Sequence, residues 1–185
     1  FDEGRERRRT PNTPPLLLCA GRLKLPEKGQ DTLLSALPLL EKQVGPVRLQ
    51  LAGDGPDAER IADLATDRVE LLGWVKDLRP LREAADLFVL PSRAEGFPNS
   101  LLEAMAEAMP VAATRVGAIE EMTDGGRVAR LAAPDDPGSL AEAMAAALDD
   151  GEALGRRGSA FVRERFAPGK VLADYASLYE EVAAR

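Results

Sequence analysis

Short apolar runs that alternate with longer helical patterns limit the folds open to this chain. Six runs have the length and composition of buried strands and are bounded by Gly, Pro, Asp or Arg: 16–20, 47–52, 69–72, 87–90, 111–114 and 128–131. Helical patterns lie between and after them, at 30–44, 58–66, 78–85, 100–108, 138–149, 152–166 and 170–184. Strands that alternate with helices in this way predict βαβ units and a parallel sheet.

This pattern predicts a Rossmann-like, three-layer α/β/α sandwich with a parallel sheet of about six strands and with helices at its C-terminal end. A length of 185 residues suits one domain with a sizeable core. We expect this domain to span 14–185. The segment 1–13 has the composition of a solvated tail or linker, and its basic residues are Arg5, Arg7, Arg8 and Arg9.

Charge and residue content exclude several classes of function. A net charge of -7 argues against a general nucleic-acid or anionic-membrane surface. The chain contains no histidine, which removes Ser-His triads, histidine bases and histidine-ligated metal sites from this segment. Its one cysteine, Cys19, lies in the apolar run LLLCAG, so we expect a buried, inert thiol and no intrachain disulfide. No apolar run approaches the roughly 20 residues that span a bilayer.

The loop after the first strand offers two cations beside the start of a helix. Ligands of parallel α/β sheets bind outside the carboxyl ends of the strands, which makes the loops after the strands the places to search. In the first loop, GRLKLPEKGQD, Gly21 allows a close turn, and Arg22 and Lys28 could hold phosphate oxygens near the free amides of the helix. A diphosphate would suit this arrangement, and two solvated surface cations remain the alternative.

The loop after the fourth strand, in the stretch PSRAEGFPNSLLEAMAEAMP, contains two glutamates eight positions apart. Pro98 suits the start of a helix, so the free amides of 99–101 would face a ligand at the sheet edge. Glu95 precedes this helix and Glu103 lies one turn into it. Carboxylates accept hydrogen bonds from sugar and ribose hydroxyls. Acidic residues are frequent in this chain, so ordinary solvated charges explain the bare pair equally well.

A second glycine motif points to a different ligand. Gly53, Gly55 and Ala58 fit G-x-G-x-x-A, a dinucleotide fingerprint, after a strand and before a helix. The motif carries a proline in its middle and follows the second strand, and only Glu70 and Asp77 could supply the acidic residue expected further on. A tight turn without a ligand is the preferred interpretation. The dinucleotide-binding domain of an oxidoreductase stays an alternative.

Taken together, these segments resemble a known enzyme family. EGFPNSLLE is similar to the E-x7-E signature of retaining glycosyltransferases with two Rossmann-like domains (the GT-B fold). The class in question is glycosyl transferases group 1, which includes bacterial lipopolysaccharide, mannosyl and glucosyl transferases. GRLKLPEKG resembles the G-R-L…K-G loop of this family, and LAGDGP, LLGWV, ADLFVLPS and EAMAEAMPVAATRVGAIEEM follow in the family's order. The resemblance covers about 16–148. The loop VGAIEEM departs from it, since many relatives have a second Gly and a Pro-Glu pair there.

The resemblance implies that this chain is the C-terminal, donor-binding domain, and that its partner is a UDP-, GDP- or ADP-sugar. The residues that it assigns to the donor are Gly21, Arg22, Lys28, Trp74, Val75, Glu95, Gly96, Phe97, Pro98, Asn99, Ser100, Leu101 and Glu103. Glu103 would hold the ribose hydroxyls, and Glu95 would meet the sugar near its 3- and 4-hydroxyls. The backbone near Trp74 and Val75 would meet the base.

The resemblance also implies the chemistry. Arg22 and Lys28 would bind the diphosphate and stabilise it as a leaving group, and together with Glu95 they are the expected catalytic residues. No cofactor and no metal ion is implied, because cations and amides neutralise the phosphates. The N-terminal acceptor-binding domain is absent from this chain, so we expect the chain not to transfer sugar alone. A cytoplasmic enzyme, or one held at the inner face of the membrane, fits this family. A non-catalytic nucleotide-binding domain that kept the fold is a further alternative.

Overall fold

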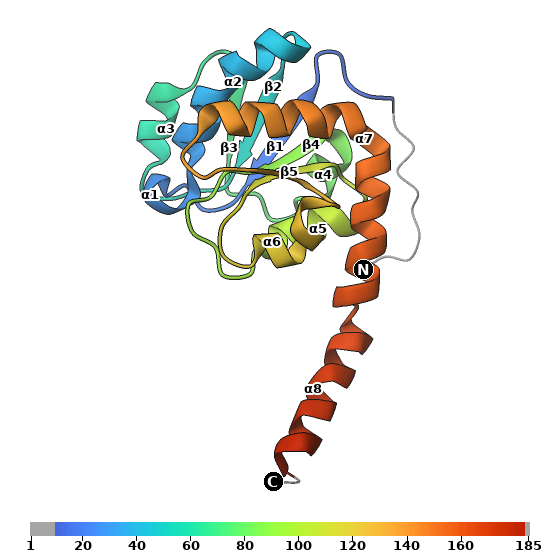
Figure 1. The fold of residues 1–185 in the computed structure, drawn as a ribbon. Helices are drawn as coiled ribbons and strands as arrows, with labels where there is room; N and C mark the ends of the chain where they lie inside the picture. The colour runs from blue at the N-terminus through green and yellow to red at the C-terminus, as the bar shows by residue number, and fades with distance from the viewer. Residues whose placement is uncertain (1–9, 184–185) are drawn as a thin grey trace.

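A six-stranded parallel sheet forms the middle layer of the computed structural model, which describes residues 10–183 (Figure 1). The order across the sheet is β3-β2-β1-β4-β5-β6, and every neighbouring pair runs parallel. In chain order the strands are β1 (Leu16–Ala20), β2 (Arg48–Ala52), β3 (Val69–Gly73), β4 (Leu87–Leu90), β5 (Val111–Thr114) and β6 (Arg130–Ala132). The predicted fold class is therefore confirmed.

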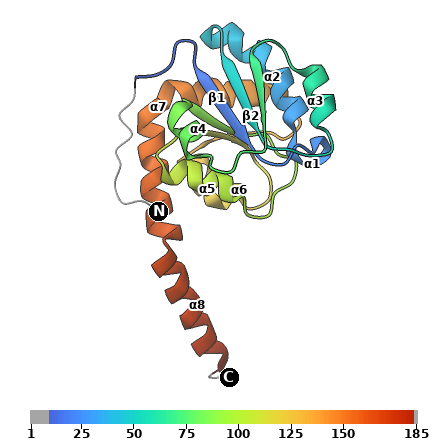
Figure 2. The same ribbon diagram turned by 180° about the vertical axis from the view of Figure 1, so that it is seen from behind.

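Helices cover both faces of this sheet. α2, α3 and the first part of α7 lie on one side, and α4, α5, α6 and the end of α7 lie on the other (Figures 1 and 2). The helical segments are α1 (Leu25–Lys28), α2 (Gln30–Val44), α3 (Ala58–Leu64), α4 (Arg79–Ala84), α5 (Asn99–Ala106), α6 (Ile119–Met122), the 3-10 turn η1 (Asp124–Gly126), α7 (Pro137–Phe166) and α8 (Pro168–Ala183). Two hydrophobic cores result, one on each face of the sheet.

Alternation along the strands divides the side chains between these cores. In β1, Leu17 and Cys19 contribute to the core under α2, whereas Leu16 and Leu18 contribute to the core under α5. All five residues of β1 are buried. Burial on both faces explains why the central strands of this parallel sheet form continuous apolar runs in the sequence.

The last two helices depart from the layered arrangement. The two helices expected at 138–149 and 152–166 both occur within the element α7, where a kink at the non-helical Gly151 (φ 46°, ψ -123°) separates them. α7 packs against both α2 and α5. α8 extends away from the sheet (Figures 1 and 2), and none of the side chains described for it is buried. Along residues 10–183, no helix combines the length and hydropathy needed to cross a bilayer.

Most expected elements are found within two residues of their predicted ends, and among the strands the last one differs most. That strand was expected at 128–131, but only the residues of β6, Arg130–Ala132, pair with β5. Val128 and Ala129 are buried in the core without joining the sheet. The short segments α1, α6 and η1 were not predicted, since four residues or fewer show no helical period.

The boundary predicted after residue 13 stays a prediction. Arg5 and Arg7 to Arg9 lie outside the described residues. Within them, Asn12 Nδ2 donates to Asp86 Oδ2 (2.6 Å) and to the Ala84 carbonyl (3.0 Å), so the segment before β1 contacts the domain.

Candidate functional site

The sheet order places the candidate site at the carboxyl ends of β1 and β4. These neighbouring strands send the chain in opposite directions, β1 towards β2 and β4 towards β5, which opens a crevice at the switch point of a doubly wound sheet. The two loops that follow them are joined, because the Arg93 and Ala94 amides donate to the Glu27 carbonyl (2.8 and 3.2 Å). Gly29 (φ +62°) allows this approach, since a Cβ there would overlap the Pro91 carbonyl oxygen.

Lys28 and Glu95, both predicted as site residues, meet in this crevice. Lys28 Nζ lies 2.7 Å from Glu95 Oε1, and the Ser92 hydroxyl donates to the same oxygen at 2.6 Å. The Glu95 side chain is 9% exposed and the Lys28 side chain 26%. An ammonium group has three donors and a carboxylate two acceptor oxygens. The pair can therefore hold itself in place and still offer donors and an acceptor to a polar ligand.

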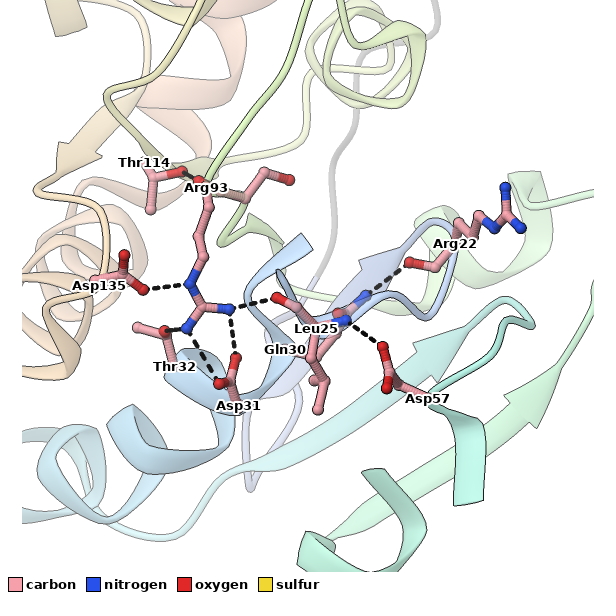
Figure 3. A network of polar contacts seen from close by, with 10 residues as sticks. Arg22, Leu25, Gln30, Asp31, Thr32, Asp57, Arg93, Thr114 and Asp135 are labelled. Carbon is pink, nitrogen blue, oxygen red and sulfur yellow. Dashed lines mark hydrogen bonds and ion pairs between the residues drawn. The ribbon is translucent and has the colours of Figure 1, made fainter. Parts of the chain in front are cut away.

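Arg22 lies apart from this pair. Its side chain extends away from the Arg93 network (Figure 3), it is exposed, and no carboxylate of residues 10–183 lies within ion-pair distance of it. Its backbone is held, because buried Gln30 donates to the Arg22 carbonyl (2.9 Å). The turn after β1 is thus fixed, while the guanidinium is available to an anion.

Arg93, which no sequence motif pointed to, links three loops at this edge (Figure 3). Its guanidinium donates to both Asp31 carboxylate oxygens (2.9 and 3.1 Å) and to Thr32 Oγ1 (3.0 Å) at the start of α2. It also binds the Leu25 carbonyl and Asp135, the latter in the loop after β6. Arg93 thereby fixes the segment that carries Ser92 and Glu95.

The electrostatics of this network favour its charged forms. The hydrogen bond to Asp31 raises the pKa of the Arg93 guanidinium, despite partial burial, and Asp135 adds to the effect. Burial pushes the pKa of the Asp31 carboxyl upward, but the hydrogen bond and the charge of Arg93 outweigh it and hold that pKa below its usual value. Arg93 lies three residues after the end of β4, so a search for polar residues just after strand ends would have found it.

Glu103 occupies a different position from Glu95. Among the described residues, it forms no hydrogen bond or ion pair with Glu95 or Lys28. Arg82 of α4 donates instead to Glu103 Oε2 at 2.8 Å. The Glu103 side chain is 50% exposed. It lies on α5 towards α4, the helix that follows the β3 loop, and therefore on the side of the crevice where that loop runs.

The start of α5 partly matches its prediction. The helix begins at Asn99 with Pro98 at the N-cap position and no side-chain cap. The Leu101 amide was expected to be free, but it donates to the Pro98 carbonyl (3.2 Å) in a tight first turn. The Leu101 side chain is fully buried. Asn99 is exposed and Ser100 half-buried, so these two can still offer amides to a ligand.

The loop before α5 is held from two sides. Gly96 is exposed, and the Phe97 ring packs edge-on against Phe166 at the end of α7 (5.7 Å between centroids). On the other side, the loop after β5 approaches so closely that a Cβ at Gly117 (φ +53°) would overlap the Glu95 carbonyl oxygen. The Glu95 backbone is therefore fixed by neighbours as well as by its side chain.

Trp74 and Val75 lie at the edge of the site. They follow β3, the edge strand, where Trp74 is 73% exposed and Val75 packs partly against the core. Three strand spacings, roughly 14 Å, separate β3 from β4. A ligand that met both Val75 and Glu95 would have to be elongated.

The G-x-G-x-x-A motif is explained by packing. A Cβ at Gly53 would overlap the Gly21 carbonyl oxygen, and one at Gly55 would overlap the Leu23 carbonyl oxygen. The Leu25 amide also donates to Asp57 Oδ2 (2.8 Å). These glycines let the loop after β2 lie against the loop after β1, which accounts for both without a ligand.

Cys19 is buried in the structure, as predicted, and its thiol is free. It is 5% exposed beneath the crevice, and burial raises the pKa of its thiol to about 12, with Lys28 lowering and Glu95 raising that value to smaller extents. We expect a disulfide reagent at pH 8 to label the native thiol about 1,000-fold more slowly than the urea-unfolded thiol, because so little thiolate is present. Stopped-flow absorbance measures both rates, and native labelling within tenfold of the unfolded rate would contradict this.

The residues that the structure describes form no cluster of metal ligands. In the part of the chain that the structure describes, no group of three or more Asp, Glu or Cys side chains is placed to hold a metal ion. The ligand groups of the crevice are cations, hydroxyls, amides and single carboxylates, which suits an anionic, hydroxyl-rich organic ligand.

Comparison with known proteins gives consistent matches. Residues 14–150 match the profile of the family "Glycosyl transferases group 1". The lipopolysaccharide core biosynthesis glycosyltransferase LpsE of Rhizobium meliloti is 38% identical over 57% of this chain and 31% of its own length. A GDP-mannose-dependent alpha-(1-6)-phosphatidylinositol monomannoside mannosyltransferase of Mycobacterium tuberculosis is 33% identical over 80% and 43%. The crystal structure of Anabaena Alr3699/HepE with UDP-glucose has a TM-score of 0.75 and 26% identity, over 92% of this chain and 49% of that one. The chain thus spans about a third to a half of the length of each of these three proteins.

Proposed function

Since the chain belongs to the glycosyl transferases group 1 family, we propose that it forms the donor-binding half of a retaining glycosyltransferase. Its ligand is a nucleotide diphosphate sugar. The observation that carries the proposal is the Lys28–Glu95 contact at the carboxyl ends of β1 and β4, which pairs a phosphate-binding cation with a hydroxyl-binding carboxylate. HepE, which shares this fold at 26% identity, was crystallised with UDP-glucose, and the mycobacterial relative is named as GDP-mannose-dependent.

The order of groups along the sheet edge supports an extended donor. The loop after β3 carries Trp74 and Val75 for the base, the loop after β1 carries Arg22 and Lys28 for the diphosphate, and the loop after β4 carries Glu95 for the sugar. Glu103, on the α4 side of α5, would meet the ribose between base and diphosphate. Base, ribose, diphosphate and sugar follow each other in the same order in the ligand.

The reaction follows from these roles. The bond between the anomeric carbon and the diphosphate oxygen breaks, and its electron pair leaves with the diphosphate. Arg22 and Lys28 stabilise the charge that develops on this leaving group, and the Asn99 and Ser100 amides add to that effect without a metal ion. Glu95 positions the sugar through its hydroxyls. An acceptor hydroxyl forms the new bond to the anomeric carbon on the same face, and its proton passes to the departing diphosphate oxygen.

The acceptor site lies outside this chain in the proposal. Because the chain spans about a third to a half of its relatives, we propose that a further domain supplies the acceptor wall of the active site. The chain alone then binds the donor without transferring sugar. Retention, metal independence and the inactivity of the isolated chain are all part of this proposal.

Two alternatives to the proposed function predict different results in nucleotide-binding measurements. A dinucleotide-binding domain would bind NAD more tightly than UDP or GDP. A non-catalytic domain that kept the fold would show the same nucleotide affinity with and without its predicted site residues. The packing that explains Gly53 and Gly55 disfavours the first alternative.

We expect Arg22→Ala and Glu103→Ala each to weaken the binding of a nucleoside diphosphate by about 1–3 kcal/mol, since each removes charged hydrogen bonds. Calorimetry with UDP, GDP, ADP, their sugars and NAD measures this on the chain itself. Arg48→Ala is the matched control, because exposed Arg48 starts β2 at the opposite edge of the sheet. Unchanged affinity in the Arg22→Ala/Glu103→Ala double variant would contradict the proposal.

A further inference from the structure

A buried arginine joins α4 to α5 behind the proposed ribose site. Arg82 is 5% exposed, although it is charged. Towards α5 its Nε and one terminal nitrogen donate to the two oxygens of Glu107 (2.9 and 2.7 Å), and its other terminal nitrogen donates to Glu103 Oε2 (2.8 Å). Burial lowers the pKa of this guanidinium, but Glu107 and then Glu103 raise it, and the net shift is upward. The arginine therefore stays charged.

The two glutamates are held in different ways. Glu107 receives a two-pronged fork, the geometry in which arginine binds a carboxylate most tightly, and it sets the plane of the guanidinium. Glu103 receives one bond on one oxygen, and its side chain remains 50% exposed. Glu107 thus anchors Arg82, and Arg82 then holds Glu103 without covering it.

Without Arg82, the Glu103 side chain would not stay in its present position. Glu103, on α5, and Glu107, at its C-cap, stand four positions apart, where like charges repel each other. A glutamate released from Arg82 would sample several rotamers in solvent and would have to be ordered again when a ligand bound. A carboxylate held in one rotamer avoids that loss of entropy.

We propose that Arg82 is a positioning residue that keeps Glu103 ready to accept a hydrogen bond from a ribose hydroxyl, with Glu107 as its anchor. This inference rests on the proposed function and deepens it. A structural staple between α4 and α5 would use the same contacts, but it would affect all nucleotides equally. The positioning role affects only ligands that carry ribose hydroxyls.

The test compares each of UDP, GDP and ADP with its 2′,3′-dideoxy counterpart by calorimetry. The measured quantity is the ratio of the two affinities, which reports the ribose hydroxyls alone. Arg82→Gln should lower this ratio roughly fivefold, about the worth of one hydrogen bond, and leave the affinity for the dideoxy nucleotide unchanged. Glu103→Gln should lower it as well, and the double variant should lose little more, because the two side chains act in series.

A second variant and a control keep the test decisive if Arg82→Gln unfolds. Glu107→Gln leaves Arg82 and Glu103 in place and should lower the ratio roughly twofold through a weaker anchor. Arg156→Gln removes an exposed Arg–Glu pair on α7 and should leave the ratio unchanged. A normal ratio in Arg82→Gln and Glu107→Gln, with a reduced one in Glu103→Gln, would overturn the role of Arg82 alone. A normal ratio in Glu103→Gln would overturn the ribose assignment, and the role of Arg82 with it. No nucleotide binding by the unaltered chain would overturn the proposed function, and the role of Arg82 with it.

Discussion

Gly155→Ala is expected to lower the free energy of unfolding by about 3 kcal/mol, at the high end for an overpacked site. Inside a helix this substitution ordinarily stabilises by roughly 1 kcal/mol, because alanine is the better helix former. Here a Cβ would overlap the backbone carbonyl oxygen of Ala108, just after α5. A backbone atom cannot move aside as a flexible side chain can, so α7 and α5 would have to separate.

The matched control is Gly169→Ala on α8, where a Cβ would meet nothing within 4 Å. That variant should be neutral or slightly stabilised. Urea unfolding followed by circular dichroism measures both, and for a chain of this length a loss of 3 kcal/mol corresponds to a fall in Tm of roughly 6–12 °C. Equal stabilities of the two variants would show that the α5–α7 contact is looser than the structure describes.

The fold was accessible from the sequence because its strongest signals are local. The central strands are buried on both faces and therefore appear as apolar runs, and α2 has a full helical period over 30–44. The order of strands across the sheet has no such local signal, since nothing in a single run says which neighbour it pairs with. The break of α7 at Gly151 was accessible, because the sequence predicted separate helices at 138–149 and 152–166.

The site was only partly accessible for a related reason. Lys28 and Glu95 could be proposed together because strand ends converge in a parallel sheet. Arg82 belongs to no motif, and only tertiary packing brings it between Glu103 and Glu107. The Leu101 amide was expected to be free, but the first turn of α5 closes on Pro98 and uses it. Side chains from separate helices that contact each other only in the folded protein cannot be paired from the local sequence pattern.

Lys28→Ala should weaken the binding of UDP, GDP or ADP by up to about 3 kcal/mol, roughly 100-fold, the upper range for charged hydrogen bonds. The substitution removes the ammonium that would neutralise the diphosphate. It also leaves the charge of Glu95, a carboxylate only 9% exposed, next to the ligand with the Ser92 hydroxyl as its remaining partner among the described residues. The loss should be seen for nucleoside diphosphates and be small for the nucleosides, which lack phosphate.

A double variant separates these two contributions. Because part of the loss is repulsion from uncompensated Glu95, Lys28→Ala/Glu95→Gln should bind the bare nucleoside diphosphate about tenfold more tightly than Lys28→Ala alone, as expected for coupled neighbours. Nucleotide sugars should not regain affinity in the same way, since Glu95 is also their hydroxyl acceptor in the proposed site. Lys42→Ala is the charge-matched control, as Lys42 lies at the far end of α2, roughly 18 Å along the helix from its first residue. Equal losses in Lys28→Ala and Lys42→Ala, or no recovery in the double variant, would mean that the Lys28–Glu95 pair is a surface ion pair without a diphosphate to bind.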